Sequence, residues 1–150
     1  MIAYHHKREI STMKKLISAL DYLDCELQYR MYALPDLCRQ TAAETDGLIS
    51  HIFLRLANEL EDQVSPDVRR CMHSVLAKTK DIPLATRECL QLLGDLLGRF
   101  DLQGQVKGLQ NVRQACRVKL NKLMSNLEVR VRSYQTLGLC AGAAIVILLI

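Results

Sequence analysis

The sequence has few aromatic residues, no tryptophan and no secretory leader. Phenylalanine and tyrosine together account for 5% of its 150 residues. Proteins that bind nucleic acid interleave basic residues with aromatic side chains that stack on bases. The basic part of this chain lacks that pattern, with only Tyr134 at its end, so nucleic acid is not an expected partner. Residues 1–6 contain no apolar core of a signal peptide.

Motifs for metals, cofactors and catalysis are also missing. The chain has six cysteines, but no two lie within twelve residues of each other, which excludes a C-x-x-C pair. Several fall at apolar positions of helical patterns, so we expect small buried side chains in a reducing compartment, without a disulfide. The four histidines lack the partners that a helical metal site uses. The sequence therefore predicts no enzyme, metal, cofactor or small-molecule substrate.

No segment has the alternation of a β-strand, and apolar residues recur at steps of three and four, which predicts helices. Asp46, Ser65 and Asp101 are expected to cap the third, fourth and last of them. The helices are expected at 10–34, 35–43, 46–60, 65–78, 83–98 and from 101 onward. We therefore predict an all-α bundle of about six helices whose long last helix runs into a C-terminal membrane anchor. The bundle domain is expected at 1–132.

Residues 137–150 carry no charge. They would form about 21 Å of helix, against a hydrocarbon core of about 30 Å, and a start at Ser133 extends the helix to about 27 Å. The alternative is a buried core helix of a soluble protein. The run is apolar on all faces, which favours a transmembrane anchor at 133–150. The anchor residues are Leu137, Leu139, Ala143, Ile145, Val146, Ile147, Leu148, Leu149 and Ile150.

Positive charge is concentrated before this run. From Leu102 onward seven bases face one acid, a local charge of +6, whereas residues 1–101 sum to −2, in a chain of net charge +4. Basic residues beside an apolar span stay on the cytoplasmic side and attract anionic lipid. We therefore expect the bundle to face the cytoplasm. The juxtamembrane basic residues are Lys119, Lys122, Arg130 and Arg132.

Three segments resemble the stage III sporulation protein AB family of endospore-forming Gram-positive bacteria. They read LxxLxxELxY at 20–29, LGxxDxxGQ at 97–105 and YxxLGxxxG at 134–142. Two features differ from the family. The chain starts after the point where the usual N-terminal transmembrane helix of the family would lie, so either the start site was placed late or that helix is absent from this chain. The tryptophan of the middle helices is also missing, where residues 68–76 stand.

The resemblance implies a non-enzymatic component of the channel complex between mother cell and forespore. Its helical domain would be similar to that of the type II secretion platform protein, coupling a cytoplasmic ATPase to membrane proteins of the complex. It would lie on the mother-cell side of the membrane around the forespore. The alternative is a tail-anchored helical adaptor or coiled-coil interaction protein unrelated to sporulation.

Several residues of the resembling segments are candidates for partner contact or for a structural motif. The alternative for Glu26 is a solvated helix residue, and the alternative for Asp101 is a helix cap. The candidate residues are Glu26, Tyr29, Leu97, Gly98, Asp101, Gly104 and Gln105.

Overall fold

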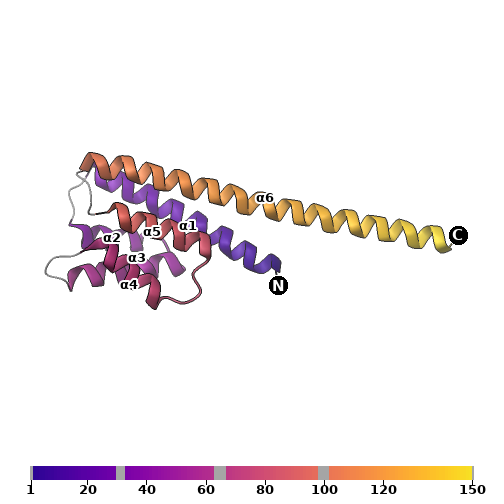
Figure 1. Cartoon of the computed structure of the whole chain (residues 1–150), viewed down its shortest axis with the longest axis horizontal. Helices are drawn as coiled ribbons and strands as arrows, with labels where there is room; N and C mark the ends of the chain where they lie inside the picture. The colour runs from indigo at the N-terminus through magenta and orange to yellow at the C-terminus, as the bar shows by residue number, and fades with distance from the viewer. Residues whose placement is uncertain (1, 30–32, 63–66, 98–101, 150) are drawn as a thin grey trace.

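The computed structural model describes residues 2–29, 33–62, 67–97 and 102–149, and the regular elements in these ranges are all α-helices (Figure 1). The all-α prediction is confirmed, and five of the six helices fall close to the expected ranges, whereas the first helix begins at Ile2 and not at Ile10. In chain order they are α1 (Ile2–Tyr29), α2 (Leu34–Ala43), α3 (Gly47–Glu61), α4 (Val68–Lys78), α5 (Leu84–Leu96) and α6 (Leu102–Leu149).

Helices α1 and α6 lie side by side and run antiparallel (Figure 1). At about 1.5 Å per residue, the 48 residues of α6 extend for about 72 Å, far beyond the end of α1. Both helices contact α5, and α1 also contacts α2 and α3. The pair therefore forms the spine against which the shorter helices pack.

The core forms because each helix presents one apolar stripe to its neighbours. Phe53 in α3 is fully buried, and α1 and α6 contribute their own stripes on either side of α5. Burying each large apolar side chain contributes about 1.5–3 kcal/mol, which is enough to fix which face of a helix turns inward. The stripe of α1 is Met13, Leu16, Leu20 and Leu23, and that of α6 is Leu109, Val112 and Cys116.

The helix caps differ in part from the expected ones. Asp67 is the N-cap of α4, and its carboxylate accepts hydrogen bonds from the backbone N–H groups of Arg69 at 3.1 Å and Arg70 at 3.4 Å. Ser65, the expected cap, lies outside the described residues. Asp46 occupies the N-cap position of α3 but makes no capping hydrogen bond. The prediction of an Asp46 side-chain cap is wrong because its carboxylate pairs instead with the Lys15 ammonium, 2.9 Å away.

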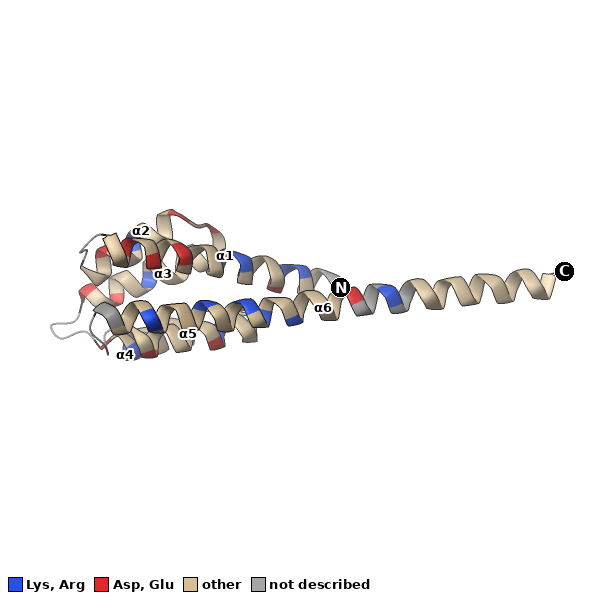
Figure 2. Cartoon of the chain, turned by 90° about the horizontal axis from the view of Figure 1, so that it is seen from above, with Lys and Arg blue, Asp and Glu red and all other residues tan. Residues whose placement is uncertain are grey.

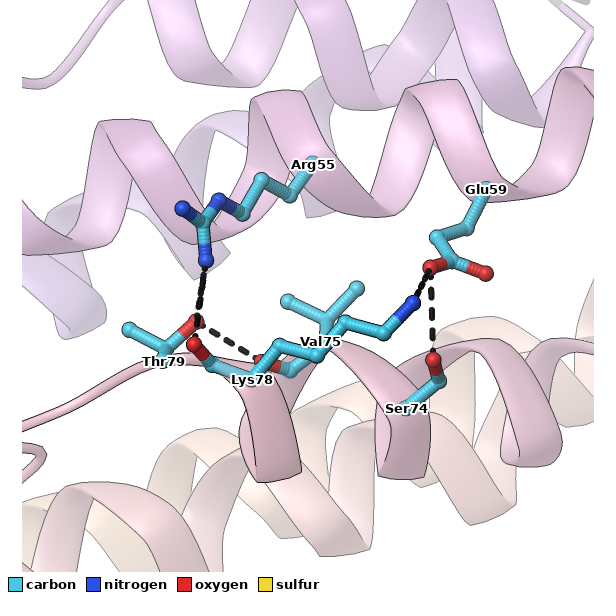
Figure 3. A network of polar contacts seen from close by, with 6 residues as sticks. All are labelled: Arg55, Glu59, Ser74, Val75, Lys78 and Thr79. Carbon is cyan, nitrogen blue, oxygen red and sulfur yellow. Dashed lines mark hydrogen bonds and ion pairs between the residues drawn. The ribbon is translucent and has the colours of Figure 1, made fainter.

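A polar network joins α3 to α4 along their exposed side (Figure 3). Glu59 Oε1 accepts from Lys78 Nζ at 3.0 Å and from Ser74 Oγ at 3.2 Å. Arg55 Nη1 donates to the Lys78 carbonyl and to Thr79 Oγ1, both at 3.4 Å. An arginine at this position partners the carbonyl groups that the last turn of a helix leaves without an intrahelical donor.

Two glycines let the helices approach closely. A β-carbon at Gly94 would lie 2.7 Å from Met72 Cβ, and one at Gly108 would lie 2.0 Å from Leu96 Cδ1. At distances this short a methyl group would force its neighbour to shift, so α5 closely approaches α4 at Gly94 and α6 at Gly108.

None of the helices formed by the described residues is both long and apolar enough to cross a membrane. The transmembrane part of the fold prediction is therefore not confirmed. The uncharged run is short for this purpose, at about 21 Å of helix against a hydrocarbon core of about 30 Å.

Candidate functional site

A cluster of ion pairs around Arg113, which we call the Arg113 clasp, fixes the register between α1 and α6. Arg113 Nη2 lies 2.5 Å from Asp21 Oδ1, and Arg113 Nη1 lies 2.9 Å from Asp24 Oδ2. Gln28 Nε2 donates to Asp24 Oδ1 at 3.2 Å, and the Arg117 guanidinium lies 3.7 Å from Asp21. The Arg113 and Asp24 side chains are only 19% and 12% exposed, so their charges depend on each other for compensation.

Sequence reasoning missed this clasp. Asp24 and Arg113 are 89 residues apart, and each one alone resembles an ordinary charged helix residue. The only available signal was the spacing of Asp21 and Asp24, which places two acids on one face of α1. Nothing in the sequence indicates which basic residue they meet.

The antiparallel register brings two of the family-like segments to one end of the bundle (Figure 1). We define the distal end as residues 26–29 of α1 and 104–108 of α6. Tyr29 is 80% exposed there, whereas Glu26, Gly104 and Gln105 are half-buried. Leu97, which follows α5, is 2% exposed and belongs to the core. Gly98 and Asp101 lie outside the described residues.

The C-terminal part of α6 extends away from the bundle in the opposite direction (Figures 1 and 2). We define the projecting segment as residues 135–149, all of which are exposed. Its large apolar side chains are 56–86% exposed, with Leu148 the most exposed of them. The expected anchor residues other than Ile150, which lies outside the described residues, are therefore free for contact with another apolar surface.

The four juxtamembrane basic residues are in different environments. Lys119 is paired with Glu88 of α5, and the hydrogen bond to that carboxylate raises the pKa of the lysine. This residue therefore helps to hold α5 against α6. Lys122 and Arg132 are exposed. Arg130 lies in α6, and its side chain is outside the described part of the structure.

Two of the buried cysteines, Cys38 and Cys116, are unsuited to nucleophilic chemistry. Burial raises the pKa of the Cys38 thiol to about 12. Cys89 and Cys116 meet in the core between α5 and α6, where their hydrogen bond, together with burial, raises the pKa of Cys116. A thiol that stays protonated is a poor nucleophile and a poor metal ligand. Four cysteines are buried as expected, whereas Cys25 and Cys140 are exposed.

Across the described ranges, no group of three or more histidine, cysteine, aspartate or glutamate side chains is arranged to hold a metal ion. The surfaces with distinctive chemistry are instead the distal end and the projecting segment. One offers an exposed tyrosine beside polar side chains, and the other offers a continuous apolar surface.

These features define a class of all-α protein in which the exposed apolar end of one long helix projects from a helical bundle. The chain belongs to the stage III sporulation protein AB family, because the sequence model described as "Stage III sporulation protein AB (spore_III_AB)" matches residues 1–150. The family resemblance of the sequence is thereby confirmed.

A solved structure described as "Stage III sporulation protein AB (SpoIIIAB)" is similar to this chain. The TM-score is 0.69 at 18% sequence identity, and the match covers 81% of this chain and 97% of that one. At this identity the likeness shows the fold alone. The comparison with curated proteins found no match.

Proposed function

We propose that this chain is a non-enzymatic, membrane-attached assembly component of a sporulation complex, where it couples a cytoplasmic ATPase to the membrane machinery. Family membership supports a role in sporulation. It favours this proposal over a helical adaptor unrelated to sporulation. The similarity to a type II secretion platform protein, which the family resemblance implies, is part of the proposal.

The observation that supports the proposal is that the distal end and the exposed apolar projecting segment lie in opposite directions along α6. From Gly104 to Leu137, α6 rises by roughly 50 Å. Over the first part of this distance the Arg113 clasp and the core stripe hold α6 against α1. A partner bound at the distal end would therefore be kept at a set distance from whatever surface receives the projecting segment.

The exposed apolar side chains of the projecting segment support membrane attachment. Soluble monomers rarely expose a large contiguous apolar patch, and such patches mark sites of membrane or protein contact. A bilayer can thin around a short apolar helix, or neighbouring helices can cover it. The bundle would then face the cytoplasm on the mother-cell side.

Contact with the ATPase is assigned to the distal end. Tyr29 is a large side chain that is 80% exposed, and tyrosine is enriched among residues that dominate binding energy in interfaces. Glu26 and Gln105 provide polar groups near the same end of the helix pair.

Membrane attachment is tested by placing a charge in the projecting segment. Ala143→Lys should release the full-length protein from membranes on carbonate extraction, because a lysine near the centre of a membrane-spanning helix costs about 3 kcal/mol. Gln114→Lys, which adds the same charge at an exposed position of α6 outside the projecting segment, is the matched control and should remain bound. Complete extraction of the unmodified chain would remove the membrane part of the proposal.

Contact with the ATPase is tested by pull-down with two tyrosine variants. Tyr29→Ala should reduce capture of the ATPase of the complex by at least about tenfold if Tyr29 is a dominant contact. The control is Tyr4→Ala, which removes a tyrosine that is 71% exposed at the opposite end of α1. This variant should capture the ATPase as well as the unmodified chain does. Equal capture by both variants would exclude Tyr29 as a contact.

A further inference from the structure

The first half of α1 adds positive charge to the end of the bundle from which the projecting segment leaves. Lys7, Arg8 and Lys14 lie in this half of α1, which runs beside the middle of α6 (Figures 1 and 2). Lys15 is compensated by Asp46, and Lys119 by Glu88. Within the described ranges, no ion pair involves Lys7, Arg8 or Lys14, so their charges are available to a ligand.

A groove of about 380 Å³ lies between these two helices. Ile10, Met124 and Leu127 supply its apolar surface, with Ile10 9% and Met124 38% exposed. Lys7 and Lys14 line the α1 side, and Glu128 lines the α6 side. The groove thus combines an apolar lining with two ammonium groups and one carboxylate, and it has a net charge of +1.

This combination matches an anionic phospholipid. A phosphodiester with one negative charge balances the net charge of the groove, and its glycerol and upper acyl carbons can cover the apolar lining. A zwitterionic phosphatidylcholine headgroup has no net charge and lacks this complementarity. A purely electrostatic contact would not need the apolar lining, and a purely apolar one would not need the lysines.

The position of the groove along α6 fits a lipid headgroup. Leu127 precedes Ser133 by six residues, or about 9 Å of helix, and Lys7 lines the same groove. The headgroup and interfacial region on each side of a bilayer is several ångströms thick, and lysine side chains extend toward it. An attached projecting segment would therefore hold the groove next to the headgroup region, within reach of its lysine side chains.

We propose that the groove between the first half of α1 and residues 124–128 of α6 is a binding site for an anionic phospholipid. The proposal rests on the proposed membrane attachment, which brings the groove to the bilayer surface. The site would fix the rotation and tilt of the helix pair on the membrane, and hence the direction in which the distal end points.

The experiment measures co-flotation of the full-length protein, at limiting lipid, with vesicles of phosphatidylcholine alone or of phosphatidylcholine mixed with phosphatidylglycerol. The unmodified chain should prefer the mixed vesicles. The double variant Lys7→Gln with Lys14→Gln should lower binding to them by up to about thirtyfold, because each lysine near an anionic surface contributes about fivefold. Its binding to phosphatidylcholine vesicles should be unchanged.

The matched control is the double variant Arg70→Gln with Lys107→Gln, which removes two positive charges from exposed positions elsewhere on the bundle. Thermal unfolding of both variants confirms that they fold. If the control loses as much binding to the mixed vesicles, the effect comes from the overall positive charge of the protein, and the proposed site is overturned. Flotation is repeated with inorganic phosphate added at matched ionic strength. If phosphate abolishes the preference for the mixed vesicles, the groove is a site for free anions, and the proposed phospholipid site is overturned.

The two proposals can fail separately. If the unmodified chain prefers phosphatidylglycerol in the way described but carbonate extracts it from the vesicles, the anchor fails and the lipid site stands. If the chain resists extraction but binds both kinds of vesicle equally, the anchor stands and the lipid site is overturned.

Discussion

In the first part of α6, Leu109, Val112 and Cys116 are 0–6% exposed because they lie against neighbouring helices, whereas Leu139 and Ile147 near its end are 77% and 75% exposed. Both parts belong to one uninterrupted helix. Apolar character alone therefore does not decide burial. At about 25 cal/mol per Å² of apolar surface, the uncovered part retains a substantial driving force to associate with a membrane or a partner.

The charged residues of the two parts differ in the same way. Arg113 is held by two aspartates of α1, whereas Arg132 is exposed near the start of the projecting segment. The first part of α6 thus contributes to folding, and the second part is available for attachment. Substitutions of the same type in each part should have different consequences for stability.

The largest difference is expected for truncation of leucine. Leu109→Ala should lower the free energy of unfolding by about 2–5 kcal/mol, because it leaves a cavity among buried side chains. Leu139→Ala, in the same helix, should change it by less than about 0.5 kcal/mol. Chemical denaturation of both variants measures the difference. A similar loss for Leu139→Ala would show that the projecting segment packs against the bundle.

A smaller difference is expected for arginine. Arg113→Gln should cost about 1–2 kcal/mol, less than the loss of a fully buried ion pair, because Asp21 is 45% exposed and water can screen it. Arg132→Gln should leave stability unchanged. The same denaturation measurement applies, and equal midpoints for the two variants would mean that the clasp does not stabilise the α1–α6 register.

The third comparison replaces a glycine in each part. A methyl group at Gly108 would meet the Leu96 side chain, whose end can shift, at a packing cost of about 1–3 kcal/mol. Alanine also favours a helix over glycine by about 1 kcal/mol, and this gain offsets part of the packing cost. Gly108→Ala should therefore lower the thermal midpoint modestly. Gly142 has nothing within 4 Å of such a methyl group, so Gly142→Ala should not lower the midpoint. Stabilisation by Gly108→Ala would contradict the close approach of α5 and α6.

The smallest effect concerns pH. Hydrogen bonds from Lys78 to Glu59 and from Arg39 to Glu61 lower the pKa of both carboxyl groups from 4.5. Because the folded-state pKa is the lower one, these pairs stabilise the fold above about pH 4.5, and the contribution is lost as pH falls through the folded values. The thermal midpoint should fall slightly on acidification, less so in Glu59→Gln. The projecting segment has no such groups, so its helix should be insensitive to the change.

The sequence by itself determined the helices, the apolar projecting segment and the family. Apolar residues at steps of three and four are local information, and they predicted the bounds of α2 to α5 closely. Pro35 and Pro83 lie at or near the starts of α2 and α5, where the fixed φ of proline favours a helix beginning. The segments at 20–29, 97–105 and 134–142 were enough to indicate the family.

Only the tertiary structure decided which residues meet. Arg113 lies between Asp21 and Asp24, Cys116 meets Cys89, and Lys7 shares a groove with Leu127. These pairs depend on the antiparallel register of α1, α5 and α6, because residues far apart in sequence have no local pattern that links them. Asp46 also shows this dependence, since its position predicted a cap but the approach of Lys15 offered its carboxylate a different partner.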